Sequence, residues 1–291
     1  MNKYSLAIIG GGALWGFMGV FTRELTARGF SSPNTVFIRC AIASLFFGLT
    51  ILFQDKSKFK MRLRDFWCFF GSGICSLLFF TVCYFRAIEI TSLSTAAILL
   101  YTAPSFVMLM SFPLFGEKLT RRKVTALLMA FLGCCLVSGI GGGTDLTTMG
   151  LVYGLCAGFG YALYSIFARF AMLRGYDSLT INFYSCFLTA VGAGMIWGFG
   201  TPLQLTFAST DTLLLCLTFG FVVSYLPYLM YTYGLTKTEN GKASVMASVE
   251  PVVATLLGTI VFHEKLSILG AAGAVLVLGA IAVLNTGKVR A

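Results

Sequence analysis

The chain has 291 residues, of which 57% are hydrophobic and 11% are charged, whereas an ordinary soluble domain has roughly 25% charged residues. A soluble globule of this size lacks the polar surface to cover so much apolar material. The composition therefore indicates a protein embedded in lipid, and it excludes a soluble enzyme, a nucleic-acid-binding domain and a secreted disulfide scaffold. The net charge of +10 comes from basic residues that lie mainly in the short links between apolar stretches.

Glycine, proline and charged residues divide the chain into ten apolar stretches, each close to the roughly 20 residues that a transmembrane helix needs. We predict an all-α polytopic membrane protein with ten transmembrane helices and no soluble domain. Because nine comparable segments follow the first, it is expected to be a span rather than a signal peptide. The predicted spans are 5–22, 34–53, 66–85, 93–114, 124–141, 149–168, 179–199, 212–233, 243–262 and 267–285.

The 21 Lys and Arg residues fall unequally on the two sides of the predicted membrane. Sixteen lie on the side that holds both termini, four lie on the opposite side, and Arg39 lies inside the second span. Because short cytoplasmic loops collect basic residues, we predict a multi-pass protein of the cell (inner or plasma) membrane with both termini in the cytoplasm.

The sequence contains an internal repeat. Residues 12–40 match eight of 29 positions when shifted by 146, and residues 84–119 match nine of 36 when shifted by 147. We therefore expect a first five-helix repeat over 1–145 and a second over 146–291. An odd number of spans in each unit inverts the second copy in the membrane, and inverted repeats are typical of secondary transporters that work by alternating access.

A family resemblance rests on motifs that occur in both copies. The sequence is similar to the ten-span branch of the drug/metabolite transporter (DMT) superfamily that has two EamA domains. The resemblance covers essentially the whole chain and implies transport of small polar metabolites, often the export of amino acids. His263 departs from the glycine that the family commonly has, which is expected to weaken that turn slightly. The motifs are Ala96, Pro104 and Gly116-Glu117-Lys118-Leu119, then Ala243, Pro251 and His263-Glu264-Lys265-Leu266, together with Trp15-Gly16, Arg39 and Glu250-Pro251.

Two prolines occupy matching positions inside the fourth and ninth spans, Pro104 and Pro251. A proline leaves a carbonyl of the preceding turn without its helical partner, and interrupted spans at corresponding repeat positions are the best sequence indication of a transport site. We predict a helix-breaking or gating role for both residues. A packing kink is the alternative.

Two charged residues lie inside apolar spans, Arg39 in the second and Glu250 in the ninth. Glu250 is a candidate to bind a substrate ammonium or a proton, or to be a fixed partner of a Tyr, Lys or Arg. Arg39 is a candidate to bind a substrate carboxylate, or it extends to the outer headgroups. Together they would suit a zwitterion. Glu250 lies roughly opposite a polar stripe that includes Ser244 and Ser248, so the sequence leaves open which face of the span lines a cavity.

Aromatic residues with a hydroxyl or indole N–H also lie in the spans, where these groups need partners. Trp15 aligns with Tyr161, and Tyr84 with Tyr231. We predict that Trp15, Tyr84, Tyr101, Tyr161 and Tyr231 line a substrate cavity, with packing or interface anchoring as the alternative. Two further tyrosines in the spans are Tyr164 and Tyr228.

No cofactor or metal site is predicted. The nine cysteines lie in or beside apolar runs without a C-x-x-C pair, and His263 is the single histidine. The sequence also has no G-x-x-x-x-G-K-[ST] loop for ATP. The expected partners are a small-molecule substrate, the lipid bilayer and a coupling proton or counter-substrate, without nucleic acid, and the expected state is a monomer or homodimer.

Three functions remain open. The first is a secondary transporter that moves small polar metabolites, such as amino acids or related compounds, outward by alternating access. The second is an exporter of lipophilic cations or drugs, favoured by the abundant Phe and Tyr and by the single buried acid. The third is a membrane enzyme or receptor, which we disfavour because the sequence has no cluster of His, Asp, Ser or Cys near one leaflet. No catalytic residue is predicted.

Overall fold

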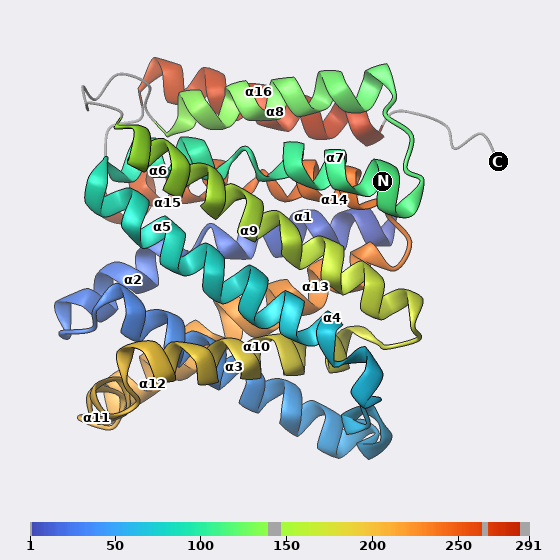
Figure 1. Ribbon diagram of the computed structural model, residues 1–291. Helices are drawn as coiled ribbons and strands as arrows, with labels where there is room; N and C mark the ends of the chain where they lie inside the picture. Colours follow the sequence, from blue (N-terminus) through green and yellow to red (C-terminus); the bar gives the residue numbers. More distant parts are fainter. Residues whose placement is uncertain (1, 139–146, 264–266, 286–291) are drawn as a thin grey trace.

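The computed structural model describes residues 2–138, 147–263 and 267–285, and every regular element in these ranges is a helix (Figure 1). The first half contains α1 (Lys3–Trp15), α2 (Met18–Ala27), α3 (Ser32–Gln54), η1 (Lys56–Phe59), η2 (Leu63–Asp65), α4 (Phe66–Phe70), η3 (Gly71–Leu78), α5 (Phe79–Ile90), α6 (Leu93–Leu100), α7 (Ala103–Phe115) and α8 (Arg121–Val137). The second half contains α9 (Thr148–Leu173), α10 (Ser178–Trp197), α11 (Gly200–Thr206), α12 (Thr210–Gly220), η4 (Phe221–Tyr225), α13 (Leu226–Leu235), α14 (Asn240–Ala247), α15 (Glu250–Phe262) and α16 (Ile268–Asn285).

The described residues form nine helical stretches that are long and apolar enough to cross a membrane. The fifth predicted span corresponds to α8, which packs along α16 at the top of Figure 1. The predicted end of that span at residue 141 lies outside the described residues. The all-α polytopic fold is confirmed. The nine stretches are Lys3–Ala27, Ser32–Gln54, Leu63–Ile90, Leu93–Phe115, Thr148–Leu173, Ser178–Trp197, Thr210–Leu235, Asn240–Phe262 and Ile268–Asn285.

Polar caps explain where many of these helices begin. The side chains of Ser31, Ser92, Thr120, Thr147 and Asp177 each accept a hydrogen bond from a backbone N–H in the first turn of the following helix. Such a cap satisfies one of the N–H groups that a helix start leaves without a partner. Short polar links thus suffice to end one span and begin the next.

The packing of the spans follows the repeat. α1 packs on α13, and their counterparts in the other repeat, α9 and α5, pack on each other. α3 packs on its counterpart α10, and α8 packs on its counterpart α16. The helices of the last pair approach so closely that a Cβ on Gly133 would lie 2.7 Å from the carbonyl oxygen of Gly273. Small residues thus let two spans approach without a strong apolar driving force between them.

The fourth and ninth spans are interrupted at matching positions. α6 ends at Leu100 and α7 begins at Ala103, whereas α14 ends at Ala247 and α15 begins at Glu250. In both spans a proline, Pro104 or Pro251, occupies the first turn of the second helix, where a missing N–H is tolerated. The third and eighth spans carry the π-helical segments η3 and η4, which also end at matching positions of the two repeats.

Candidate functional site

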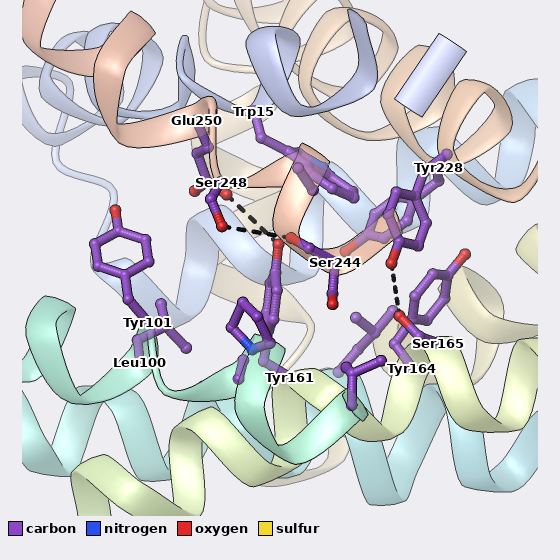
Figure 2. A pocket seen from close by; sticks show the side chains of 16 residues that line it. Trp15, Leu100, Tyr101, Tyr161, Tyr164, Ser165, Tyr228, Ser244, Ser248 and Glu250 are labelled. Carbon is purple, nitrogen blue, oxygen red and sulfur yellow. Dashed lines mark hydrogen bonds between the residues drawn. The ribbon is translucent and has the colours of Figure 1, made fainter. Parts of the chain in front are cut away.

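A cavity lies where the interrupted fourth and ninth spans meet α1, α9 and α13 (Figure 2). The space in which the centre of a water molecule fits is about 40 Å³. The cavity therefore has room for a small chemical group in this conformation. Its aromatic and polar lining consists of Trp15, Tyr101, Tyr161, Tyr164, Tyr228, Tyr231, Ser165, Ser244, Ser248 and Glu250.

Glu250 is the charged residue of the cavity lining. It is the first residue of α15, immediately after the interruption, where the positive end of the helix dipole stabilises a carboxylate. The Tyr161 hydroxyl of α9 donates a hydrogen bond to Glu250 Oε2 over 3.5 Å. The corresponding residue of the first repeat is Ala103, which also lines the cavity. The two halves thus line the cavity with residues at corresponding positions, but only the second half provides an acid there.

The indole of Trp15 is the centre of the aromatic wall. Its ring lies 6.5 Å from Tyr161, 5.3 Å from Tyr228 and 5.5 Å from Tyr231, measured between ring centroids. These rings come from α1, α9 and α13. Aromatic faces attract both apolar groups and cations, so this wall is suited to an organic substrate that carries an ammonium group.

Glycines bring α1 and α9 against the two helix interruptions. A Cβ on Gly12 would lie 2.8 Å from the carbonyl oxygen of Ala247, which the missing N–H of Pro251 leaves without its helical donor. Gly158, the counterpart of Gly12, lies in the same way against the fourth span, since its Cβ would be 3.0 Å from the carbonyl oxygen of Leu99. The sequence thus holds the backbone of both interruptions next to the cavity.

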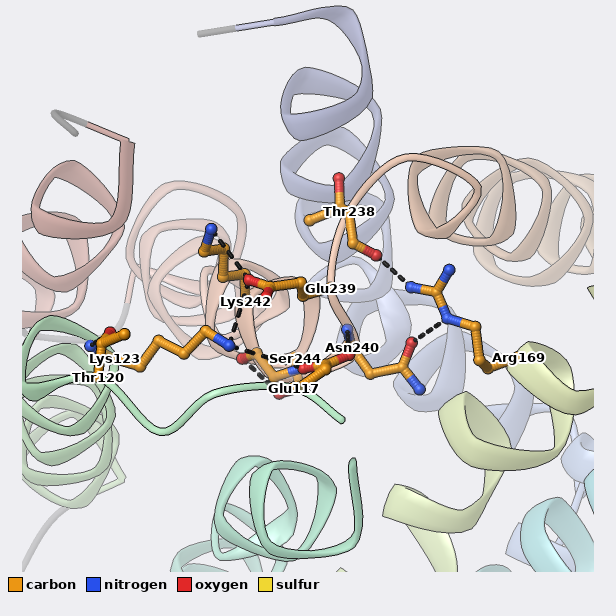
Figure 3. A network of polar contacts seen from close by, with 10 residues as sticks. Glu117, Thr120, Lys123, Arg169, Thr238, Glu239, Asn240, Lys242 and Ser244 are labelled. Carbon is orange, nitrogen blue, oxygen red and sulfur yellow. Dashed lines mark hydrogen bonds and ion pairs between the residues drawn. The ribbon is translucent and has the colours of Figure 1, made fainter. Parts of the chain in front are cut away.

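A polar network lies at the predicted cytoplasmic end of the bundle, where α7 ends and α14 begins (Figure 3). The Glu117 carboxylate accepts hydrogen bonds from the backbone N–H groups of Asn240, at 2.6 Å, and Gly241, at 3.1 Å. Lys123 has a side chain 3% exposed and lies 3.8 Å from Glu117 and 3.2 Å from Glu239. The start of α14 is thereby tied to the end of α7 and the start of α8.

The network continues to the cavity through α9. The Arg169 guanidinium donates to the Asn240 side chain at 2.9 Å and to the carbonyl oxygen of Thr238. The Asn240 amide donates to the carbonyl oxygen of Ser165 at 3.0 Å, and the Ser165 and Tyr231 hydroxyls lie 2.7 Å apart. Ser165 and Tyr231 line the cavity, so a chain of hydrogen bonds connects the cavity lining to the network at the predicted cytoplasmic end.

Glu239 lies outside the spans, and its charge is held by cations. Burial opposes its ionisation, but Lys242 at 3.0 Å and Lys123 at 3.2 Å keep the pKa of the Glu239 carboxyl below its ordinary value. The Glu239 carboxylate is therefore ionised at neutral pH.

A sequence profile of the EamA-like transporter family matches residues 2–139 and, a second time, residues 148–286. The chain belongs to the EamA-like transporter family. This confirms the resemblance to the DMT superfamily. The EamA-like chain is thus a multi-pass membrane transporter by family, and the family is one of transporters rather than of enzymes.

Two curated relatives align with most of this EamA-like transporter. It is 26% identical over 286 residues to an uncharacterized transporter of Archaeoglobus fulgidus, which covers 97% of this chain and 96% of the relative. It is 27% identical over 256 residues to the uncharacterized transporter YxxF of Bacillus subtilis, with 85% and 78% of the two chains covered. A solved structure described as "Crystal structure of protein" has a TM-score of 0.81 at 18% identity, over 97% of this chain and 96% of that chain, so the two share a fold.

The structure brings most of the predicted site residues of the EamA-like transporter to one cavity. Trp15, Tyr101, Pro104, Tyr161, Tyr231 and Glu250 all line it. Pro251 is buried at the interruption without lining the cavity. Tyr84 is also outside the lining, and its ring packs 5.7 Å from that of Phe80.

Arg39 is buried outside the cavity lining. Its side chain is 5% exposed, it donates from Nη1 to Ser224 Oγ at 3.5 Å, and it lies beside Tyr228. Because Arg39 is buried inside the bundle, its side chain does not extend to the outer headgroups, which was the predicted alternative. Among the described residues, the structure gives no hydrogen bond or ion pair between Arg39 and Glu250, so the two do not form one charge pair in this conformation.

The cavity lining also contains residues beyond the predicted site, notably Ser165, Ser244, Ser248, Tyr164 and Tyr228. On a helical wheel of the ninth span, Ser244 and Ser248 belong to a polar stripe opposite Glu250. The helical wheel assumed a continuous helix, but the chain leaves the helix after Ala247 and re-enters it at Glu250. The interruption turns Glu250 to the same cavity as the two serines.

Metal ligands do not cluster in the described part of the chain. Within the ranges that the structure describes, no group of three or more His, Cys, Asp or Glu side chains could hold a metal ion. The turn motif at Glu264, Lys265 and Leu266 lies outside these ranges.

Proposed function

We propose that this EamA-like transporter is a secondary transporter that moves small polar metabolites, amino acids or related amines, outward across the inner or plasma membrane by alternating access. The observation that carries the proposal is Glu250, a single acid at the interruption of the ninth span, facing an aromatic cavity. A substrate ammonium in this cavity would form a charge-assisted hydrogen bond to Glu250 while its apolar part packs on Trp15. A proton or counter-substrate would supply the energy.

The matched features of the two halves support an inverted-repeat mechanism. We assign residues 1–145 and 146–291 to the two repeats because their helix interruptions, π-helical segments and span contacts lie at corresponding positions. In inverted-repeat transporters one half rocks against the other around a central site. In the proposed cycle, inward opening separates α14 from Glu117 and Arg169 and thereby breaks the polar network of Figure 3.

Export of lipophilic cations is the second candidate. A specific observation favours it, because the cavity lining contains six aromatic side chains and Glu250, but no Lys or Arg. Aromatic faces beside one carboxylate suit a cation without a carboxylate of its own. In this alternative Arg39, which lies outside the lining, has a purely structural role.

Transport by the purified protein in liposomes tests both candidates. Under an imposed proton gradient, we expect flux of radiolabelled amino acids, a loss of at least about tenfold in Glu250→Gln, and no loss in Glu24→Gln, an acid that is 54% exposed beside Arg28. Flux of cationic dyes without amino acid flux would favour the second candidate. No flux of either class, or a Glu250→Gln variant equal to the wild type, contradicts the proposed site.

A further inference from the structure

The link between α3 and α4, residues 55–65, holds more Lys and Arg residues than any other link of the chain and is named here the basic loop. It carries five of the 21 Lys and Arg residues of the protein. The loop is not extended, because it folds into the two 3-10 turns η1 and η2, and the Asp55 side chain accepts a hydrogen bond from Ser57 N at the first turn. A defined backbone therefore presents these cations.

Contacts to the following repeat fix the basic loop in place. Lys58 Nζ lies 2.7 Å from Asp177 Oδ2. Asp65 Oδ1 lies 3.1 Å from Arg174 Nε, and its Oδ2 accepts a hydrogen bond from the Tyr176 hydroxyl at 2.9 Å. The Tyr176 hydroxyl in turn accepts one from the backbone N–H of Arg62 at 3.0 Å. The loop thus forms one platform with the link between α9 and α10.

These contacts hold two of the negative charges of the platform, Asp65 and Asp177, in ion pairs. The Asp65 side chain is 5% exposed. Burial opposes the charge of Asp177, but hydrogen bonds from Lys58 and Thr180 hold the pKa of this carboxyl below its ordinary value. Asp65 and Asp177 are therefore paired with Arg174, Lys58 and the helix cap, and Asp55 is the one exposed acid of the loop, where it caps Ser57 N.

Four cations remain on the outer surface of the basic loop: Lys56, Lys60, Arg62 and Arg64. Each is exposed, and the described residues provide no ion pair for any of them. Apolar side chains lie among them. Leu63, between the two arginines in sequence, is 86% exposed, and Phe53 at the end of α3 is 82% exposed. Both apolar residues lie at the ends of stretches that are long and apolar enough to cross a membrane.

We propose that the basic loop is a binding site for the headgroups of anionic phospholipids, with Lys60, Arg62 and Arg64 contacting the phosphates and Leu63 inserted among the acyl chains. A lipid surface offers phosphates to the unpaired cations and acyl chains to the exposed leucine, whereas an acidic soluble protein would offer partners to the cations alone. Each of these cations is attracted to an anionic membrane surface. The inference does not depend on the transported substrate.

Lipid titration of the purified full-length protein tests the site. In a non-ionic detergent, short-chain phosphatidylglycerol is expected to raise the melting temperature at concentrations where phosphatidylcholine has no effect. We expect Lys60→Gln/Arg62→Gln/Arg64→Gln to weaken the apparent affinity for phosphatidylglycerol at least about tenfold. The charge-preserving variant Lys60→Arg/Arg62→Lys/Arg64→Lys should retain it. If the triple Gln variant does not fold, Arg62→Gln alone decides the case, with an affinity loss of about fivefold expected from the removal of one cation.

A matched control removes three other cations from the same predicted side. Lys118, Arg121 and Lys237 are exposed and have no ion pair among the described residues, so their replacement by Gln changes the net charge equally. We expect this control to change the affinity less than twofold. Equal losses in the two triple variants, an equal effect of phosphatidylcholine, or the same stabilisation by inorganic phosphate alone would each overturn the proposal.

Discussion

His263 adopts the same left-handed backbone conformation as Gly116, its counterpart in the first repeat. The φ angle is 54° at His263 and 67° at Gly116, and the two backbone N–H groups bond to carbonyls at corresponding positions, Gly258 and Ser111. The same turn therefore ends α15 and α7, although only the first copy has the residue that suits it. Of the described non-glycine residues, His263 is the one with a positive φ.

This difference predicts a stabilising substitution. An L side chain in the left-handed region costs about 1 kcal/mol, so His263→Gly should raise the free energy of unfolding by up to about 1 kcal/mol. Gly116→His should lower it by a similar amount. Both changes are measured by denaturant unfolding in detergent. A destabilised His263→Gly variant would show that the imidazole makes contacts that outweigh the backbone strain.

Gly12 predicts a destabilising substitution. In Gly12→Ala the new Cβ meets the Ala247 carbonyl oxygen at 2.8 Å and its Cα at 3.0 Å, so α1 must move away from the interruption of the ninth span. We expect a loss of about 1–3 kcal/mol in the free energy of unfolding. Gly19→Ala is the control, because a Cβ there meets nothing within 4 Å. Equal effects of the two substitutions would contradict the close approach.

The Glu117 network predicts a second loss of stability. Glu117→Gln retains one acceptor oxygen for the two N–H groups at the start of α14 and removes a charge beside buried Lys123. We expect a loss of about 1–3 kcal/mol in thermal or denaturant unfolding. The same substitution at Glu89, whose carboxylate pairs with Arg86 at the surface, should cost less than about 1 kcal/mol. If both cost the same, the buried network adds no stability.

Glu239 predicts how stability changes with pH. Its pKa is lower in the folded protein than the ordinary value of 4.5, so its ion pairs stabilise the fold fully above pH 4.5. That contribution is lost as the pH falls from 4.5 through the folded pKa. The stability difference between the wild type and Glu239→Gln should therefore shrink on acidification over this range. A constant difference between pH 7 and the acid end would contradict the assignment.

Long apolar stretches made the spans predictable, because a lipid environment leaves few alternatives to helices of about 20 residues. The repeat also identified the paired positions of Pro104 and Pro251. It did not indicate where the helix stops, and that local break decides that Ser248 and Glu250 share one cavity. The position of Arg39 was equally inaccessible, because its partner Ser224 is far away in the sequence and their contact depends on how the second and eighth spans pack.

The single acid of the cavity has a consequence for any cycle in which the two halves exchange their shapes. If the two halves were identical, the inward-open and outward-open states of such a cycle would be related by symmetry and equal in energy. Glu250 lies in one half and Ala103 in the other. In the proposed cycle, a cation bound to Glu250 would stay with α15, and the surroundings of the cation would change as that helix moves. The acid is therefore one of the sequence differences that make the two states unequal in energy, although the backbone retains its internal symmetry.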